Sequence, residues 1–277
     1  MTWTAYKIAF RLLSPMHIGW RKLGNLQQTR SYVTGRNLWG AITARLTREQ
    51  GSNEYKAISN LVDRELTFTY FYPSVSPDPE KVSLWPWDTD EFSWAFLGSY
   101  ASTALENSRN AEEGSLHETE FIAPYARNTI QNSEPLPVYL VGYIFARDDS
   151  KLAWREALSK LQIGGERSYG WGRVSLEGIK PEATKCFDDY HYDGTGNHPL
   201  IVVPSSKKLL AHTNADVKSH GSIEPFIGRE TRDSGRFGKH LAEPNICWAP
   251  GSTIFEEKTF QIMPRGLWRE VKAYSSS

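Results

Sequence analysis

The stretch G-G-E-R-S-Y-G-W-G-R, residues 164–173, decides the fold because it joins a predicted helix to a predicted strand. Four glycines in nine residues let the backbone adopt positive φ angles and approach a neighbouring group closely. Arg167 and Arg173 add positive charge, and successive exposed N–H groups in such a loop form an anion-binding concavity. Tyr169 and Trp171 offer flat faces on which a base can stack. The loop therefore predicts a site for a nucleic acid.

The order of elements around the loop excludes a nucleotide-cofactor site. A dinucleotide or P-loop glycine run follows a strand and opens a helix, so that phosphate meets the helix N-terminus. Here the helix comes first and the strand follows, and the chain has no GKS or GKT tripeptide. The alternative is a tight structural turn, which would account for one or two of the four glycines.

Hydrophobic periodicity gives the elements on either side of this loop. Apolar residues that alternate with polar ones predict strands, a near-continuous apolar run predicts a central strand, and spacings of three and four predict helices. The resulting order, β-α-β, insertion, β-α-β, is a split βαβ arrangement of the ferredoxin-like kind. The predicted elements are strands at 6–12, 65–72, 137–146 and 173–179, helices at 36–49 and 151–161, and a loop at 14–35.

We expect an α+β protein with two halves. Residues 1–180 form a ferredoxin-like (RRM-like) domain, interrupted at about 75–135 by a polar, acidic insertion. Residues 181–199, rich in Asp and Gly, form a linker. Residues 200–277 begin with a strand at 200–203 and form a β-rich half, either a degenerate second copy of the fold or an extension of the first sheet.

The charges of the chain are separated along the sequence. Lys and Arg total 32, and Asp and Glu also total 32, a balance that taken alone disfavours a nucleic-acid binder. Residues 1–48, however, contain eight Lys or Arg and no carboxylate, whereas residues 88–120 contain eight carboxylates and only Arg109. This asymmetry predicts one face for a polyanion and another for a different partner, although mixed surface charge can also serve only solvation.

Other classes of protein are disfavoured. Lys7 and Arg11 interrupt the N-terminal apolar segment, and no stretch reaches the roughly 20 apolar residues that a membrane span needs. Cys186 and Cys247 stand alone without metal-ligand spacing, which is typical of free thiols in a reducing cytoplasm. We therefore expect a cytoplasmic protein without membrane contact, bound cofactor or metal site.

Five short motifs, at 14–19, 32–41, 164–173, 228–230 and 248–252, together resemble the CRISPR-associated RAMP superfamily. Residues 164–173 are similar to the G-loop of that family, and S-P-M-H-I-G at 14–19 is similar to the motif after its first strand. Y-V-T-G-R-N-L-W-G-A at 32–41 resembles its helix-opening signature, with Thr34 at a position where proline is usual. G-R-E at 228–230 and W-A-P-G-S at 248–252 resemble type III subunits that cap the 5′ handle of the guide RNA.

The resemblance implies a RAMP domain in a type III CRISPR antiviral effector, a ribonucleoprotein complex. It implies that the chain binds guide RNA (crRNA) at its 5′ handle and meets target RNA only indirectly. The expected protein partners are a large polymerase/cyclase-type subunit and backbone RAMP subunits, with the acidic insertion facing them. The residues expected to bind RNA are His17, Arg21, Lys22, Arg30, Arg36, Gly164, Gly165, Arg167, Ser168, Tyr169, Gly170, Trp171, Gly172, Arg173, Arg229, Arg232 and Arg236.

No catalytic residue is expected. Guide-processing RAMP enzymes use a histidine or similar group without metal, and His17 is the candidate in this chain, which leaves a metal-independent endoribonuclease as the alternative. In those enzymes the G-loop lies near the chain end, whereas about a hundred residues follow Gly172 here. A target-cleaving backbone subunit, the further alternative, uses an aspartate after the first strand, and residues 1–48 contain no carboxylate.

Overall fold

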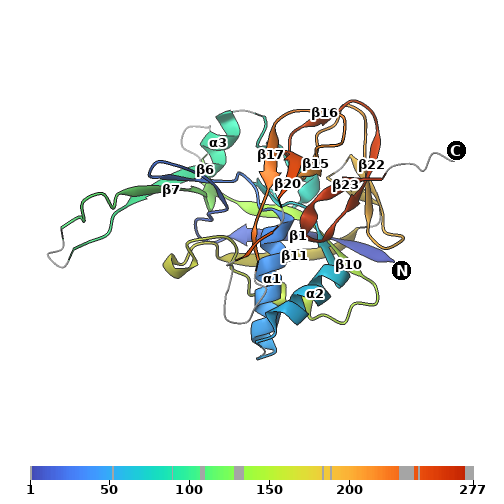
Figure 1. Cartoon of the computed structure of the whole chain (residues 1–277), viewed down its shortest axis with the longest axis horizontal. Helices are drawn as coiled ribbons and strands as arrows, with labels where there is room; N and C mark the ends of the chain where they lie inside the picture. Colours follow the sequence, from blue (N-terminus) through green and yellow to red (C-terminus); the bar gives the residue numbers. More distant parts are fainter. Residues whose placement is uncertain are drawn as a thin grey trace.

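The computed structural model combines several β-sheets with a few helices, as the α+β prediction requires (Figure 1). None of the helices within the described ranges is long and apolar enough to cross a membrane. The structure describes residues 2–51, 53–88, 90–106, 110–127, 134–182, 184–187, 189–230, 240–242 and 244–271.

A five-stranded antiparallel sheet forms the centre of the molecule. Its first strand, β1 (Trp3–Leu12), lies between β11 (Val174–Glu182) and β10 (Tyr139–Arg147). β10 pairs on its other side with β4 (Leu66–Phe68) and β5 (Tyr72–Ser74). The strands predicted at 6–12, 137–146 and 173–179 therefore lie side by side in this sheet.

The strand predicted at 65–72 is split into β4 and β5. Between them the Thr69 hydroxyl accepts a hydrogen bond from the backbone N–H of Tyr143 at 2.8 Å, in place of a backbone carbonyl. At the neighbouring Gly142, a Cβ atom would lie 2.7 Å from the Tyr70 carbonyl oxygen. The chain therefore leaves regular strand geometry for three residues, which alternation alone does not reveal.

Helices cover one face of the central sheet (Figure 1). α1 (Gly35–Glu49) agrees with the helix predicted at 36–49, and α4 (Trp154–Leu158) is a shorter version of the helix predicted at 151–161. α2 (Tyr55–Glu65) was not predicted, although its buried Tyr55, Ile58, Ser59 and Val62 follow helical spacing. A fourth helix, α3 (Asp90–Phe96), has seven residues and lies within the segment predicted as an insertion.

A separate β-sheet from the C-terminal half covers the other face of the central sheet. In β10, Leu140 and Ile144 pack toward the helices, while Tyr143 and Phe145 pack toward the C-terminal half. Burial on both faces explains why the sequence of β10 is apolar up to Ala146. The C-terminal half does not extend the central sheet. The C-terminal sheet has eight strands, two of which, β12 and β13, come from the segment 181–199 that was predicted as a linker. In spatial order the strands are β12 (Lys185–Cys186), β13 (Tyr190–Asp193), β14 (Leu200–Val203), β22 (Lys258–Ile262), β23 (Trp268–Glu270), β15 (Thr213–Asn214), β20 (Asn245–Trp248) and β17 (Ile223–Phe226).

A third sheet, of four strands, forms an arm that projects from the body (Figure 1). Its strands are β2 (Gly19–Leu23), β3 (Leu26–Thr29), β7 (His117–Ile122) and β6 (Leu97–Ser102), in that order. The loop predicted at 14–35 was therefore wrong for 19–29, which form a hairpin whose turn contains Gly24 at φ +59°. β3 pairs in parallel with β7 and so joins this hairpin to the segment predicted as an insertion.

The remaining elements are short. They are strand pairs β8 (Tyr125–Ala126) with β9 (Leu136–Pro137), β16 (Ser219–His220) with β21 (Thr253–Ile254) and β18 (Arg229–Glu230) with β19 (His240–Leu241), and 3₁₀ turns η1 (Pro79–Lys81), η2 (Arg167–Tyr169) and η3 (Pro264–Gly266).

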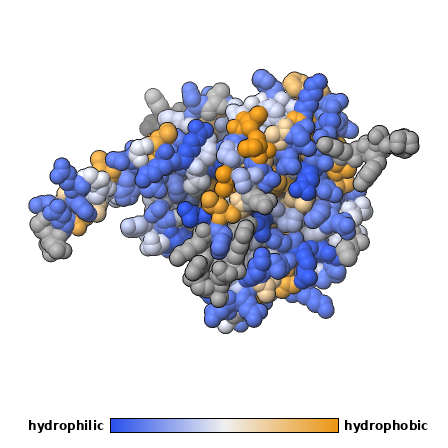
Figure 2. Space-filling view, viewed as in Figure 1, coloured by the Kyte–Doolittle hydropathy of each residue, from blue (hydrophilic) through white to orange (hydrophobic). Residues whose placement is uncertain are grey.

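Most of the visible surface is hydrophilic, with one apolar stripe near the middle and top of the view (Figure 2). Three isoleucines of the β17 and β20 region have large exposed fractions, 56% for Ile223, 47% for Ile227 and 59% for Ile246. β17 is an edge strand of the eight-stranded sheet, so its outer backbone edge has no strand partner in that sheet.

Candidate nucleic-acid interface

A hollow of about 490 Å³ lies where the G-loop, the start of α1, the β2–β3 hairpin and the C-terminal half meet. Four residue groups from distant parts of the sequence form its wall, and both halves of the molecule contribute. Its lining residues include Gly19, Trp20, Arg30, Thr34, Arg36, Asn37, Trp39, Tyr55, Gln162, Gly164, Arg167, Phe226, Gly228 and Arg229.

A second hollow of about 530 Å³ continues from the first along α1 toward α4. The two share Ala41, Ala44, Gln162 and Arg167, so together they form one depression, which we call the basic groove. Its floor along α1 is made of the small residues Gly40, Ala41 and Ala44, which allow a ligand backbone to approach the helix closely.

Cations alone supply the charged lining of the basic groove. Among the described residues that line it, there is no Asp or Glu. A wall of one sign focuses the electrostatic field and raises the local concentration of a ligand of opposite charge. The groove therefore has the electrostatics of a polyanion site in a chain whose net charge is zero. The seven cations are Arg30, Arg36, Arg45, Arg48, Lys160, Arg167 and Arg229.

Two of these cations are held by one carboxylate. Glu49 Oε1 lies 2.7 Å from Arg45 Nη2 and 2.9 Å from Lys160 Nζ, and so links the end of α1 to the turn after α4. The hydrogen bond from Lys160, followed by the one from Arg45, lowers the pKa of the Glu49 carboxyl. Glu49 itself does not line the groove.

The glycines of the G-loop are explained largely by close packing against the turn after β1. Gly165 N–H donates to the His17 carbonyl at 2.8 Å, and Gly172 N–H donates to the Pro15 carbonyl at 2.7 Å. A Cβ atom would lie 2.4 Å from the His17 oxygen at Gly164, and 1.9 Å from the Ile163 oxygen at Gly172. Both residues also have positive φ, +93° and +76° respectively. Only glycine fits these two positions without a shift of the backbone.

The middle of the G-loop projects as the η2 turn. Gly170, at φ +81°, ends this turn and has open space around it. Tyr169 is 80% exposed, whereas the ring of Trp171 packs edge-on against Phe121 of β7 with centroids 5.2 Å apart. Of the two aromatic residues, Tyr169 therefore remains available to a ligand, and Trp171 fastens the loop to the arm.

His17 is buried between the G-loop and the arm. It is 7% exposed, and its Nδ1 lies 2.8 Å from the Glu120 carbonyl oxygen of β7. A carbonyl only accepts, so Nδ1 carries the proton. This bond and the close contact with Gly165 give His17 a part in fastening three segments together.

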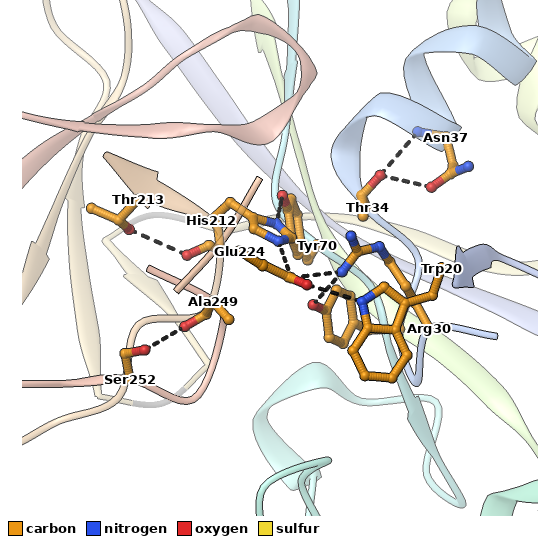
Figure 3. Close-up of polar contacts among 12 residues, drawn as sticks. Trp20, Arg30, Thr34, Asn37, Tyr70, His212, Thr213, Glu224, Ala249 and Ser252 are labelled. Atoms are coloured by element: carbon orange, nitrogen blue, oxygen red, sulfur yellow. Dashed lines mark hydrogen bonds and ion pairs between the residues drawn. The ribbon is translucent and has the colours of Figure 1, made fainter. Parts of the chain in front are cut away.

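A partly buried hydrogen-bond network joins the two halves beside the basic groove (Figure 3). Glu224 of β17 accepts from Arg30 Nη1 at 2.7 Å, from Trp20 Nε1 at 2.9 Å and from His212 Nε2. On the other side of the imidazole, the Tyr70 hydroxyl oxygen lies 2.6 Å from His212 Nδ1. With Nε2 donating to the carboxylate, Nδ1 accepts from the Tyr70 hydroxyl, and the imidazole is neutral.

The pKa shifts in this network agree with that assignment. Burial opposes ionisation of Glu224, but the hydrogen bonds from His212 and Arg30 outweigh it and lower the pKa of the carboxyl to about 2. Burial lowers the pKa of His212 despite its bond to Glu224. Burial also raises the pKa of Tyr32, beside Arg30, to about 12. At neutral pH the charged groups of the network are therefore the ionised Glu224 carboxylate and the Arg30 guanidinium, which form an ion pair.

The start of α1 is fixed by its cap and by the C-terminal half. The Thr34 hydroxyl accepts from Asn37 N–H and donates to Asn37 Oδ1 at 2.7 Å, the role of an N-cap residue. Gly35 packs against η3, where a Cβ atom would lie 2.8 Å from the Arg265 carbonyl oxygen. Arg36 crosses over Gly228, and its Nη2 lies 3.4 Å from the Arg229 carbonyl oxygen.

The structure brings together some of the sequence-predicted residues and separates others. Arg30, Arg36, Gly164, Arg167, Ser168 and Arg229 line the basic groove. Arg21 and Lys22 lie on β2, next to Trp20, and are exposed. Arg173 is exposed at the start of β11, and its backbone bonds to Leu13 and Ser14. His17, Gly165, Trp171 and Gly172 pack inside the loop assembly, Tyr169 and Gly170 lie on its outer turn, and Arg232 and Arg236 fall outside the described residues.

Sequence reasoning missed four residues of this region. Arg45, Arg48 and Lys160 line the second hollow, and Glu224 anchors Arg30 from the other half. A signal existed for the arginines, because they follow Ala41 and Ala44 at helical spacing. No local signal existed for Glu224, which is 194 positions from Arg30.

Comparisons with known proteins give a family and a fold. A search of curated proteins gives no match at the significance threshold. One similar solved chain is from the cryo-EM structure of the "Type III-B Cmr-beta bound to cognate target RNA and AMPPnP, state 1", with a TM-score of 0.50, 12% identity and coverage of 89% of this chain and 84% of that chain. A chain from the structure with cognate target RNA alone has a TM-score of 0.43, 16% identity and coverage of 65% and 61%. The model of the RAMP superfamily matches residues 9–175, more than half of the sequence, and the chain therefore belongs to the RAMP superfamily.

Proposed function

We propose that this protein is a non-catalytic subunit of a type III CRISPR effector complex, and that its basic groove binds the 5′ handle of the guide RNA. The observation that carries the proposal is the groove itself, lined by seven Lys or Arg and, among the described residues, by no carboxylate. Lys and Arg contacts to phosphates supply most of the affinity of single-stranded RNA sites. Membership of the RAMP superfamily supports the assignment to CRISPR effectors.

The first half is best described as a ferredoxin-like domain. In the strand order β11-β1-β10-β4, each predicted β-α-β unit has its two strands separated by one strand of the other unit. That arrangement supports the split βαβ interpretation. The other face of the sheet is covered, so we place the RNA in the groove rather than across the sheet.

A catalytic role for His17 is not part of the proposal. A general base must reach the 2′-hydroxyl of its substrate, and His17 is 7% exposed with Nδ1 bonded to a carbonyl. We therefore assign it a structural role. Repeat RNA incubated with the protein in EDTA should stay intact. Specific cleavage that His17→Ala abolishes would replace this proposal with a guide-processing endoribonuclease.

The β6–β7 part of the arm is proposed to contact neighbouring protein subunits, a backbone RAMP subunit or the large polymerase/cyclase-type subunit. The described residues 97–106 and 110–122 contain no Lys or Arg, and Glu112, Glu113 and Glu118 are exposed there. Leu105 and Leu116 are 66% and 60% exposed. Acidic charge repels RNA, whereas carboxylates around apolar side chains suit a basic protein surface.

Binding of a short single-stranded RNA across a salt series tests the groove. Each phosphate contact contributes about 0.7 to the slope of log affinity against log salt for single strands. The double variant Arg36→Ala/Arg167→Ala should bind more weakly and lower the slope by about 1.4. Arg64→Ala is the control, since Arg64 is exposed on α2 and lines neither hollow. Equal affinity and slope for the double variant and the control would remove the groove from the RNA site.

A further inference from the structure

Trp20 is an exposed aromatic residue whose orientation is fixed by a hydrogen bond. It lines the basic groove and is 40% exposed. Its Nε1–H donates to Glu224 Oε2 at 2.9 Å, and so ties the β2 strand of the arm to β17 of the C-terminal half. A partly exposed side chain without such a bond samples several rotamers, and ordering it on binding costs free energy.

The acceptor of this bond is itself held firmly. Glu224 Oε1 accepts from Arg30 and from His212, while Oε2 is directed to Trp20 (Figure 3). The carboxylate stays ionised because its pKa is lowered to about 2 by bonds that outweigh its burial. Both carboxylate oxygens of Glu224 therefore accept hydrogen bonds, Oε1 from Arg30 and His212 and Oε2 from the Trp20 indole.

Arg21 stacks on one face of the Trp20 ring and leaves the pair with a guanidinium plane on that side. Its guanidinium carbon lies 3.6 Å from the centroid of the indole ring, within the range of a cation–π contact. Arg21 is exposed, like Trp20, so solvent reaches the stacked pair. Nucleobases stack on both aromatic rings and guanidinium planes, and neighbouring positive charge favours the adjoining phosphate.

We propose that Glu224 is a positioning residue that holds the Trp20–Arg21 stack as a platform for one unpaired nucleobase of RNA bound in the basic groove. The inference rests on the proposed function, because the groove cations bind the phosphates on either side of that base. Pre-orientation of the indole lowers the entropy cost of stacking. The platform also makes base recognition depend on both halves, since the ring belongs to one and its anchor to the other.

Short single-stranded RNAs with 2-aminopurine at successive positions test the platform, because stacking on an indole quenches the fluorescence of that base. One position should be quenched more than its neighbours in the native protein. Trp20→Ala should abolish that extra quenching and weaken affinity about tenfold, the equivalent of about 1.4 kcal/mol. Trp94→Ala is the matched control: Trp94 is 46% exposed, has Arg127 5.9 Å from its ring and lies outside the groove lining.

The variant Glu224→Gln tests the positioning role. Its single amide oxygen is required by Arg30 and His212 at the Oε1 position, so the amide NH₂ would face the Trp20 N–H and repel it. Quenching at the platform position should then fall at least threefold at temperatures well below the unfolding transition. RNA affinity gives the control, because a phenylalanine ring has no N–H for Glu224 to accept. Glu224→Gln should weaken RNA affinity in the protein with Trp20 and change it little in a Trp20→Phe background. A general loss of structure would instead weaken affinity equally in both backgrounds.

The outcomes separate this inference from the proposed function. Uniform quenching in the native protein, or native quenching in Trp20→Ala, would overturn the platform. If Arg36→Ala/Arg167→Ala still weakened RNA binding, the groove would remain the RNA site. If neither Trp20→Ala nor the double arginine variant changed binding, both the platform and the proposed function would fail.

Discussion

Replacing Gly172 by alanine should destabilise the protein far more than the same change at Gly170, which lies on the same loop. Both glycines have positive φ, +76° and +81°, so a left-handed conformation would cost either alanine about 1–2 kcal/mol. At Gly170 nothing lies within 4 Å of the new Cβ, so conformation is the whole cost.

At Gly172 the new Cβ would lie 1.9 Å from the Ile163 carbonyl oxygen. The loop must move by more than an ångström to reach van der Waals contact. That movement strains two short bonds, Ile163 N–H to the Gly172 carbonyl at 2.8 Å and Gly172 N–H to the Pro15 carbonyl at 2.7 Å. Each contributes about 1 kcal/mol, so with the cost of the left-handed conformation the total loss for Gly172→Ala is about 3–4 kcal/mol.

Thermal unfolding followed by circular dichroism measures the difference. At about 2–4 °C per kcal/mol for a protein of this size, Gly172→Ala should lower Tm by about 10 °C and Gly170→Ala by about 4 °C. Equal Tm values for the two variants would refute the packing argument. Equal Tm values together with weaker RNA binding by Gly172→Ala would show that this glycine serves close approach of a ligand.

Three further predictions concern buried charge and buried thiols. Glu224→Gln should lower the free energy of unfolding by about 2–3 kcal/mol, because it leaves Arg30 without its counter-charge in a largely buried site. Urea denaturation measures this loss. The control Glu256→Gln, at an exposed ion pair, should leave the free energy of unfolding nearly unchanged. The free energy of unfolding should fall as the pH drops below about 6.5, because His212 gains a proton in the unfolded chain that the folded protein resists. It should fall again between pH 4.5 and about 2, because Glu224 is protonated in the unfolded chain before it is protonated in the folded protein. A free energy of unfolding that is constant from pH 7 to pH 4 would contradict this prediction. Burial raises the pKa of Cys247 to about 11 and of Cys186 well above its usual value, so neither thiol should react with a disulfide reagent at pH 8 until the protein unfolds.

The sequence predicts the central sheet well because its strands carry strong local patterns. β1 alternates and β10 is apolar up to Ala146, and each pattern follows directly from one or two buried faces. The C-terminal strands are two to five residues long, too short for a period to show, so only β14 could be placed. α2 was missed although its spacing was present, because polar residues dominate that segment.

The candidate site could be predicted only in part, for a similar reason. Arg36 and Arg167 stand next to recognisable glycine motifs, and both line the groove. Arg45 and Lys160 depend on which face of α1 turns toward α4, a matter of tertiary packing. Glu224 is defined by a contact across 194 positions, and no local pattern marks it as the partner of Arg30. The net charge of the chain was the least informative property for finding the site, because the positive charge of the groove and the negative charge of the β6–β7 segment cancel in it.

The central place of β1 has a consequence for synthesis of the protein. β1 is complete at Leu12, but its two neighbours end only at Arg147 and Glu182. On the ribosome the first strand must therefore wait while more than a hundred residues are added before it can pair on either side. Pairings of such long sequence separation make folding slow, and they leave apolar strands exposed in the meantime. We expect newly made chains to depend on chaperones until β11 has emerged.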